Sequence, residues 1–326
     1  MIKYLFRHNK DYSRFNIMKQ FTKDLQLKND IFILLPFSKN QFFKNFFKRD
    51  RIVNDFFISN YDTYVYDRKK ITNKNPRAWW KYFQDWTNFR FSKYILSDTN
   101  AHFKYWKKLF GKYNGQHFVF PVLADKDVYY PYEDEPKNEK VKILFYGSFI
   151  PLHGIDIILE SFSLMEKNGI EFEAKIIGKG QMYHKMKNLF EKLDLKQVQM
   201  NGEIIEEKEL AKEIREHDII LGIFGDSVKA KSVVPNKVYQ ALASKKTIVT
   251  MESEAINEFF NENDLVTCKN TPEVLSKELI KLINNPKLLD DTAINGYNKF
   301  LNLYDSTKSE FANFIYSIDK KLGEYR

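Results

Sequence analysis

The chain has 326 residues, 43% of them hydrophobic and 29% charged, which is ordinary for a soluble globular protein of about two domains. Its single cysteine, Cys268, excludes an internal disulfide, and no cysteines and histidines have zinc-binding spacing, so we expect a reducing cytoplasm. The sequence offers neither the ~20-residue apolar run of a membrane-spanning helix nor the apolar N-terminal run of a signal peptide.

Charge and aromatic residues are divided unevenly along the chain. Residues 1–120 carry 24 Lys and Arg against 9 Asp and Glu, a net charge of +15. The remaining 206 residues carry 28 basic and 34 acidic side chains, a net charge of −6. The first 120 residues also hold 31 of the 52 aromatic side chains, including all four Trp. A basic, aromatic half joined to a mildly acidic half indicates two domains with different partners.

The first domain is expected over residues 1–124. In chain order the pattern predicts a strand at 2–6, a helix at 14–27, strands at 30–35 and 61–66, a strand that starts at Lys93 and runs into a helix, and a strand at 117–122. The cap of the helix after Lys93 is Ser97, Asp98 or Thr99.

Two segments of this half combine aromatic and basic residues. Residues 41–57 read as a helix with Phe42, Phe46, Val53 and Phe57 on one face and Lys44, Lys48 and Arg51 beside them. That helix either faces the core or lies in a membrane interface. Residues 75–91 combine Trp and Tyr with basic side chains, which suits a membrane interface. Single-stranded nucleic acid is a lower-ranked alternative, since no nucleic-acid motif is present.

A proline-rich, charged linker at 125–140 precedes a second domain at 141–305. Strands are predicted at 141–146, 172–177, 198–201, 218–223 and 247–250, and helices at 156–168, 181–193, 206–216 and from Pro235. Further helices follow at 272–284, 287–302 and from Ser306 to the end. Regular alternation of strands and helices predicts a doubly wound parallel sheet.

Four loops that follow these strands carry candidate ligand-binding residues, at 147–154, 178–181, 202–204 and 224–232. Each is weak alone, because Gly-x-Gly turns mostly reverse the chain and a lone histidine before a helix mostly caps or packs. Together they lie at successive strand ends, where open α/β sheets bind ligands. The helix at Pro235–Ala243 adds an N-terminus that favours anions. No Walker loop, dinucleotide fingerprint, hydrolase triad or metal-ligand spacing is present.

These segments resemble the nucleotide-sugar-binding domain of family 4 glycosyltransferases. The likeness rests on Tyr146–Asp156, Ile176–Gly180, Asp218–Leu221 and Pro235–Ala243, with a further match at 96–102, 120–125 and 130–131. It covers roughly residues 93–324. The resemblance implies the α/β GT-B fold, in which two Rossmann-like domains face a cleft, with a reduced first domain and a C-terminal helix, 306–326, packed back on it.

The resemblance also implies a retaining sugar transfer from a UDP- or GDP-type nucleotide diphosphate-sugar, with no further cofactor and no metal. The implied catalytic residues are His153, Asp98 and Gln240. The implied donor-binding residues are Gly147, Ser148, Lys179, Gly180, Ile204, Phe224, Pro235, Asn236, Lys237 and Gln240. Backbone N–H groups near Asn236 and Lys237 would stabilise the departing diphosphate.

The chain departs from the family pattern at several of these positions. Ser232 and Gln240 stand where many members carry two glutamates, and Ser148 and His153 stand where many carry Arg and Lys. A protonated His153 can replace a lysine beside phosphate, as can Lys179, Lys229, Lys231 or Lys237. The loop Arg7–Lys10 replaces the family's Gly-Gly loop.

We therefore expect a cytoplasmic glycosyltransferase, peripheral at the inner membrane face, that extends a glycan or lipid-linked acceptor in polysaccharide or glycolipid synthesis. Residues 1–120 would dock on anionic lipid, and no nucleic acid is expected as a partner. The alternative is a non-catalytic subunit that binds nucleotide-sugar or a partner protein.

Overall fold

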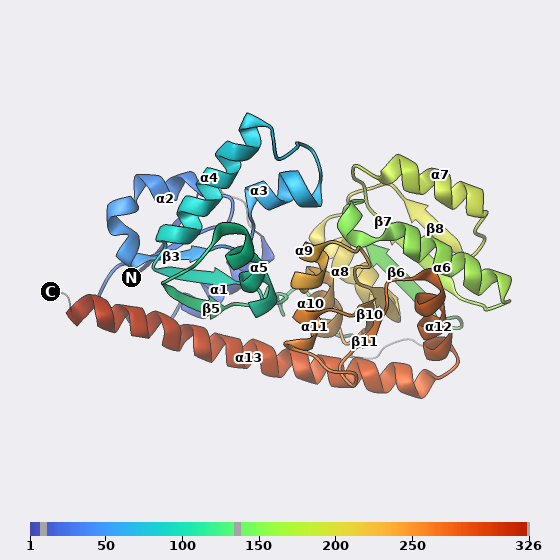
Figure 1. The fold of residues 1–326 in the computed structure, drawn as a ribbon. Helices are drawn as coiled ribbons and strands as arrows, with labels where there is room; N and C mark the ends of the chain where they lie inside the picture. The colour runs from blue at the N-terminus through green and yellow to red at the C-terminus, as the bar shows by residue number, and fades with distance from the viewer. Residues whose placement is uncertain (7–11, 134–137, 325–326) are drawn as a thin grey trace. The chain divides into compact units, whose positions relative to one another are not determined.

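Two compact units make up the chain. The structure is a computed structural model that describes residues 1–6, 12–133 and 138–324 (Figure 1). Unit 1 comprises Met1–Val122 together with Tyr304–Arg326, and unit 2 comprises Leu123–Leu303. Each unit contains one parallel sheet with helices between its strands. The loop Arg7–Lys10, which the sequence singled out, lies outside the described residues.

Unit 1 is built on a five-stranded sheet in the order β1-β2-β3-β4-β5, and every neighbouring pair is parallel. The strands are β1 (Ile2–Leu5), β2 (Ile31–Leu34), β3 (Ile52–Asp55), β4 (Tyr94–Ser97) and β5 (Gln116–Val119). All residues of β3 and β4 are buried, as is usual for central strands of a parallel sheet. Because the strands run in one direction, the ends of β3 and β4 bring Asp55 and Asp98 to the same edge.

The connections of unit 1 are helical. They are α1 (Ser13–Thr22), α2 (Asn40–Lys44), the 3-10 helix η1 (Phe46–Arg51), α3 (Asn60–Asp62), the π-helix η2 (Thr63–Asp67), α4 (Pro76–Phe91) and α5 (Asn100–Phe110). Local sequence fixes where the longer ones begin. The Asn75 side chain accepts a hydrogen bond from the backbone of Arg77, with Pro76 in the first turn of α4. Thr99 caps α5 in the same way.

Two sequence predictions in unit 1 are wrong. Residues 61–66 form α3 and η2 rather than a strand, because Ser59 caps the turn and the carboxylate of Asp85 accepts a hydrogen bond from the backbone of Tyr61 at 2.8 Å. Residues 41–57 are not one helix. They form α2, η1 and then β3, because Ile52 and the residues after it pair with β2 and β4 in the middle of the sheet. Tertiary pairing overrides the helical spacing of the phenylalanines there.

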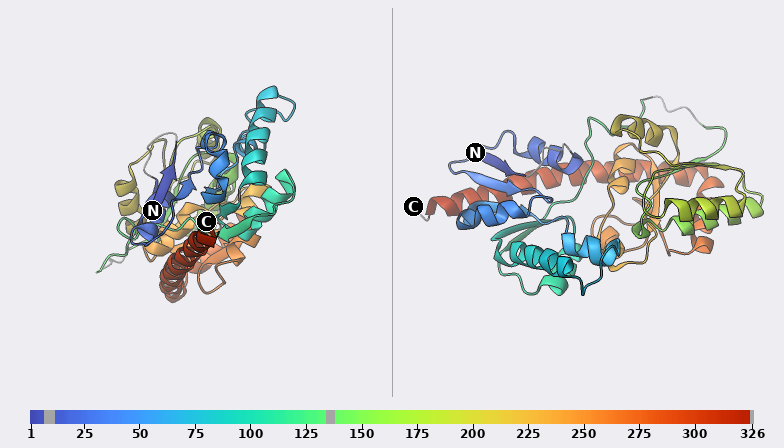
Figure 2. Two further views of the ribbon diagram at one scale, coloured as in Figure 1. Left: turned by 90° about the vertical axis from the view of Figure 1, so that its left-hand side faces the viewer. Right: turned by 90° about the horizontal axis from the view of Figure 1, so that it is seen from above.

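The C-terminal part of the chain is one continuous helix, α13 (Pro286–Glu324), of 39 residues (Figure 2). The sequence predicted two helices with a break before Ser306. No glycine or proline stands in the short stretch between them, so nothing interrupts the helix. The part after Tyr304 belongs to unit 1, where the ring of Phe311 lies 4.7 Å from that of Phe120.

Unit 2 is built on a six-stranded parallel sheet in the order β11-β10-β9-β6-β7-β8. The strands are β6 (Lys142–Tyr146), β7 (Glu173–Ile177), β8 (Val198–Asn201), β9 (Ile219–Leu221), β10 (Thr247–Met251) and β11 (Val266–Cys268). The chain runs outward from β6 through β7 to β8 and then returns to β9 on the other side of β6. This reversal makes the carboxyl ends of β6 and β9 the switch point at which such sheets bind ligands.

The helices of unit 2 follow the alternation that the sequence predicted. They are the 3-10 helix η3 (Pro151–His153), α6 (Ile155–Lys167), α7 (Tyr183–Leu193), α8 (Glu207–Glu216), α9 (Val228–Ser232), α10 (Asn236–Ala243), α11 (Glu254–Asn257) and α12 (Pro272–Ile283). Every strand and helix predicted between residues 141 and 250 is confirmed to within a few residues. Buried apolar residues of the strands and of α6 and α12, such as Phe145, Phe162 and Leu279, form one core.

Candidate functional site

Three glycines follow three adjacent strands of unit 2. Strands β6, β7 and β8 pair in register up to their last residues, so Gly147, Gly178 and Gly202 follow side by side at the carboxyl edge. Gly147 has φ 140° and Gly178 has φ 147°, values that disfavour any residue with a side chain. A Cβ on Gly178 would also collide with the carbonyl oxygen of Gly147. The close approach of the two loops therefore requires glycine at this edge.

The Gly-x-Gly turn after β7 holds the loop after β6 in place. The backbone N–H of Phe149 donates to the carbonyl oxygen of Lys179 at 3.1 Å, and a Cβ on Gly180 would lie 2.6 Å from the Phe149 backbone. The side chains of Ser148 and Lys179 remain exposed. The second glycine of this turn thus has a packing role, while the exposed residues beside it remain available to a ligand.

His153 is held at the same edge by η3 and the loop after β9. Its carbonyl oxygen accepts a hydrogen bond from the backbone of Phe224 at 3.0 Å. Gly154 follows with φ 60°, and a Cβ there would lie 2.6 Å from the carbonyl carbon of Phe224. The histidine side chain is 9% exposed, and its Cε1 would lie 2.9 Å from a Cβ built on Gly147. The loops after β6 and β9 therefore hold the imidazole against Gly147.

Lys237, in the first turn of α10, reaches the same glycine. Its Nζ would lie 3.4 Å from a Cβ on Gly147, and it donates a hydrogen bond to the carbonyl oxygen of Gly222 at 3.3 Å. Nζ also lies 4.0 Å from the centroid of the Phe145 ring. The side chain is 5% exposed, and no described carboxylate forms an ion pair with it. Lys237 is thus a buried amine without a counter-ion.

Burial disfavours the charged form of both basic groups. Burial lowers the pKa of Lys237 well below that of a free lysine. Burial also lowers the pKa of His153 well below its usual value, the charge of Lys237 lowers it further, and a hydrogen bond with the backbone of Ser148 opposes both effects. The Nδ1 atom of His153 has no hydrogen-bond partner. An anion beside Gly147 would raise both pKa values and satisfy both groups.

The start of α10 adds backbone donors at this point. The helix begins at Asn236, with Pro235 at its N-cap, and no side chain caps it. Unpaired N–H groups and the helix dipole favour an anion at such a terminus. The arrangement of Gly147, His153, Lys237 and the α10 N-terminus therefore forms a candidate phosphate-binding site at the switch point of the sheet. We call it the Gly147 site.

Gln240 lies one turn further along α10 and is engaged within the protein. Its Oε1 accepts a hydrogen bond from the Tyr146 hydroxyl at 2.7 Å, and its Nε2 donates to the Tyr129 hydroxyl at 2.8 Å. Tyr129 in turn donates to Glu207 at 3.3 Å. Ser232 is similarly occupied, since its hydroxyl donates to the carbonyl oxygen of Val228 at 2.7 Å. The roles predicted for Gln240 in catalysis and donor binding stay predictions.

The other predicted donor-binding residues fall into two groups. Asn236 and Gly180 are exposed, and Ile204, after β8, is 85% exposed. An exposed aliphatic side chain at a ligand-binding edge can pack against a flat ring. Phe224 is fully buried, so it can reach a ligand only through its backbone. Pro235 is half-buried at the α10 N-cap.

Asp98, the remaining catalytic candidate, belongs to unit 1. It is 1% exposed, and its Oδ1 lies 2.5 Å from Nδ1 of His102. The His102 ring packs on Trp106, with 4.1 Å between centroids. Neither Oδ2 of Asp98 nor Nε2 of His102 has a hydrogen-bond partner. The catalytic role of Asp98 stays a prediction.

Sequence reasoning missed two buried ion pairs at the same edge of unit 1. Arg14 binds both carboxylate oxygens of Asp55, at 2.7 to 3.2 Å. Its guanidinium also donates to the carbonyl oxygen of Pro121 at 3.1 Å. The ammonium of Lys39 lies 3.1 Å from Asp85. The partners are far apart in sequence, so no local pattern could have revealed either pair.

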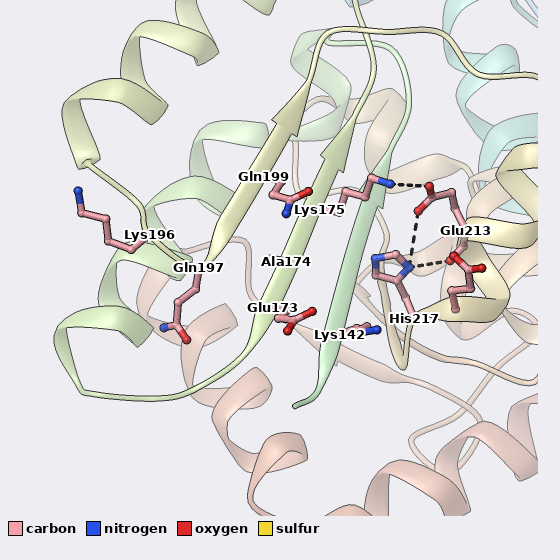
Figure 3. Close-up of a pocket in the computed structure, with 10 residues that line it drawn as sticks. Lys142, Glu173, Ala174, Lys175, Lys196, Gln197, Gln199, Glu213 and His217 are labelled. Atoms are coloured by element: carbon pink, nitrogen blue, oxygen red, sulfur yellow. Dashed lines mark hydrogen bonds and ion pairs between the residues drawn. The ribbon is translucent and has the colours of Figure 1, made fainter. Parts of the chain in front are cut away.

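A separate pocket lies at the opposite edge of the unit 2 sheet, near the amino ends of β6, β7 and β8 (Figure 3). Three of its charged or titratable side chains, Lys175, Glu213 and His217, interact with one another. Lys175 lies 2.5 Å from Glu213, and Nδ1 of His217 donates to the Glu213 carbonyl oxygen at 2.6 Å. Burial lowers the pKa of His217. In the described ranges no three His, Cys, Asp or Glu side chains form a possible metal site, here or elsewhere.

A parallel sheet whose strand order reverses at such a site is typical of α/β proteins that bind nucleotides. Residues 132–299, more than half of the chain, match the family described as glycosyl transferases group 1. The chain therefore belongs to the group 1 glycosyltransferase family. An uncharacterized glycosyltransferase of Methanocaldococcus jannaschii is 26% identical over 162 residues, which cover 47% of this chain and 41% of that protein. The chain thus matches about two fifths of the length of that curated relative.

Solved structures with low sequence identity share the fold. Sucrose-phosphate synthase from Thermosynechococcus elongatus superposes with a TM-score of 0.70 at 10% identity, over 88% of this chain and 73% of that one. HepE of Anabaena, solved in complex with UDP, has a TM-score of 0.62 at 12% identity, over 95% of this chain and 81% of that one. The pneumococcal O-GlcNAc transferase GtfA, solved with UDP and GlcNAc, has a TM-score of 0.62 at 11% identity, over 93% of this chain and 60% of that one. The two-sheet α/β architecture is the GT-B fold of glycosyltransferases.

Proposed function

We propose that the protein is a retaining glycosyltransferase that uses a UDP- or GDP-type nucleotide diphosphate-sugar and extends a glycan or lipid-linked acceptor. The observation that carries the proposal is the Gly147 site, where buried Lys237 and His153 flank a glycine and form no ion pair with any carboxylate that the structure describes. Two buried basic groups of this kind are costly unless a ligand supplies the missing charge. The diphosphate of a nucleotide-sugar has that charge.

Such a site would act on the leaving group. When the bond from the sugar to the diphosphate breaks, negative charge grows on the departing phosphate oxygen. The ammonium of Lys237, the imidazolium of His153 and the N–H groups at the start of α10 would lie beside that charge and offset it. In this proposal no metal ion is needed, because protein groups balance the diphosphate. GtfA and HepE, which share the fold, were solved with UDP.

The proposal extends to the place of action. A lipid-linked acceptor at the inner face of the cytoplasmic membrane, in polysaccharide or glycolipid synthesis, would suit a cytoplasmic enzyme that is peripheral to that membrane. The large excess of basic over acidic side chains in residues 1–120 supports contact with anionic lipid.

One observation favours a second candidate, a nucleotide-sugar-binding subunit without turnover. Ser232 and Gln240 occupy positions at which the family resemblance implies glutamates, and both bond to groups of the protein itself. Neither can supply a carboxylate to the sugar. Such a subunit would still bind the nucleotide through the Gly147 site.

Thermal unfolding in the presence of UDP, GDP and their sugars tests the shared part of both candidates. A ligand at a hundred times its Kd should stabilise the protein by about 2.7 kcal/mol. Lys237→Met should lose this gain, whereas Lys185→Met, on the exposed side of α7, should keep it. The nucleotide proposal is wrong if no nucleotide stabilises the wild type. Donor hydrolysis or transfer by the wild type, impaired in His153→Ala, separates the enzyme from the non-catalytic subunit.

A further inference from the structure

Unit 1 exposes large aromatic side chains on two neighbouring elements, η1 and α4. Phe47 is 98% exposed, Trp80 59%, Phe83 47% and Phe91 43%. Single exposed apolar residues are ordinary on protein surfaces, whereas a contiguous group marks an interaction site. What matters is therefore whether these rings adjoin one another.

They form one continuous chain of ring contacts. Along α4, centroid distances are 5.9 Å from Trp80 to Phe83, 6.3 Å from Phe83 to Trp86, and 5.8 Å from Trp86 to Phe91. The chain then passes to η1, with 5.8 Å from Phe91 to Phe46 and 6.3 Å from Phe46 to Phe47. We call Phe46, Phe47, Trp80, Phe83, Trp86 and Phe91 the aromatic ridge.

Four of the six rings of the aromatic ridge lie outside the core of unit 1. Phe46 and Trp86 are partly buried and pack against the core clusters that contain Phe42 and Phe89. The other four rings, those of Phe47, Trp80, Phe83 and Phe91, are exposed. The ridge is therefore anchored in the core at two positions and open to solvent at the other four.

Basic side chains are frequent on the elements of the aromatic ridge. Helices η1 and α4, and α2 just before η1, carry Lys44, Lys48, Arg49, Arg51, Arg77, Lys81 and Arg90. Of the two carboxylates on these elements, Asp85 is fully buried against Lys39, which leaves Asp50 as their exposed acidic residue. The guanidinium of Arg49 lies 4.7 Å from the centroid of Phe46, so charge and ring occupy the same patch.

We propose that the aromatic ridge is a docking surface for an anionic lipid bilayer. Phe and Trp rings enter the boundary between headgroups and acyl chains, and the surrounding lysines and arginines meet the lipid phosphates. The proposal rests on the proposed function, since it names the surface on which a lipid-linked acceptor would be met. Among the described residues, no helix is long and apolar enough to cross a membrane.

This surface uses parts of both segments that the sequence indicated for a membrane interface, 41–57 and 75–91. The helical face predicted within 41–57 is wrong, because Phe42 and Val53 are fully buried and Val53 belongs to β3. The exposed rings come from Phe47 in η1 and from α4, which corresponds to the segment 75–91. Only the fold brings the two segments together.

Sedimentation with lipid vesicles tests the proposal. The wild type should pellet with vesicles of equal parts phosphatidylglycerol and phosphatidylcholine, and stay in solution with phosphatidylcholine alone. Phe47→Ser/Trp80→Ser should weaken binding at least tenfold. Ile294→Ser/Tyr316→Ser, which removes two apolar side chains that are each 41% exposed, is the matched control and should bind as the wild type does. Lys48→Gln/Arg49→Gln should weaken binding roughly fivefold for each charge removed.

Three results would overturn the proposal: no preference of the wild type for anionic vesicles, equal losses in the ridge variant and the control, or a dimer in light scattering that the ridge variant abolishes. The last would make a second copy of the chain the occupant. Stabilisation by UDP, measured on the same variants, should be unchanged. It reports on unit 2, so failure of lipid binding and failure of the nucleotide proposal are told apart.

Discussion

The two units bury charged side chains at the carboxyl edges of their sheets in opposite ways. Unit 1 buries them in pairs, Arg14 with Asp55 and Lys39 with Asp85. Unit 2 buries Lys237 beside His153, and among the described residues no carboxylate pairs with either. Paired buried charges are complete without a ligand, and removing one partner is costly. Unpaired buried charges lower the stability of the protein unless an anion binds beside them. The difference indicates that the edge of unit 2 is prepared for an anion, whereas the Arg14–Asp55 and Lys39–Asp85 pairs hold unit 1 together.

The largest effect is expected from breaking a pair in unit 1. Arg14→Met leaves Asp55 buried without its cation and should destabilise unit 1 by about 3–5 kcal/mol. All four Trp lie in unit 1, so tryptophan fluorescence during urea unfolding reports on that unit alone. Arg14→Met/Asp55→Leu should cost less than Arg14→Met, because no unpaired charge remains. If the double variant is the less stable of the two, the pair does not have the role assigned here.

In unit 2, replacing a buried basic side chain is expected to increase stability rather than decrease it. Lys237→Met removes an amine that is buried without a counter-ion, and should raise the stability of the ligand-free protein by about 1–3 kcal/mol. The pKa of Lys237 is lower in the folded protein than in the unfolded chain, so the unfolded chain binds the proton more tightly. The free energy of unfolding of the wild type should therefore rise as the pH approaches the ordinary lysine pKa. The difference in stability between Lys237→Met and the wild type should then become smaller. Calorimetry measures both effects.

The exposed Lys185→Met should leave stability unchanged and serves as the control. A Lys237→Met protein that is less stable than the wild type without ligand would show that the amine has a structural partner, and the contrast between the units would then fail.

The smallest effect concerns the pH dependence of nucleotide binding. Burial and Lys237 lower the pKa of His153, so it is neutral in the free protein near neutral pH, and a bound diphosphate would raise that pKa. Binding should then take up a proton, and the Kd for UDP should increase by up to about tenfold per pH unit as pH rises. In His153→Gln the increase should be smaller. Titration of the nucleotide itself affects the wild type and His153→Gln equally, so it cancels in the ratio of their Kd values at each pH. A ratio that does not change with pH would contradict proton uptake by His153.

Much of unit 2 could be predicted from the sequence, for a physical reason. Its strands are short apolar runs, its helices have regular spacing, and glycines mark the loops at strand ends. These are local signals. The packing role of Gly180 was not visible, because it depends on the contact with Phe149 in another loop. Likewise, Gln240 was expected to bind the donor, and only the fold brings Tyr129 and Tyr146 to the two ends of its amide.

Unit 1 was harder to predict because its local patterns conflict with its tertiary contacts. The alternation in Tyr61–Tyr66 is typical of a strand, yet Ser59 and Asp85 hold the turn in a helical form. The phenylalanines near η1 have helical spacing, yet Ile52 and its neighbours pair with β2 and form the strand β3. Long-range hydrogen bonds decide these segments, and a single sequence does not show them.

The long helix α13 has a consequence for how the protein is made. Unit 2 is complete once the ribosome has added Leu303, whereas unit 1 still lacks the ring of Phe311 against Phe120. It also lacks Asp319, whose carboxylate accepts hydrogen bonds from the backbone N–H groups of Lys28 and Asn29 at 2.9 and 2.8 Å. The unit whose strands come earlier in the chain is therefore the later one to close its core. Until the part of α13 after Tyr304 has left the ribosome, the nascent sheet of unit 1 has an uncovered apolar surface.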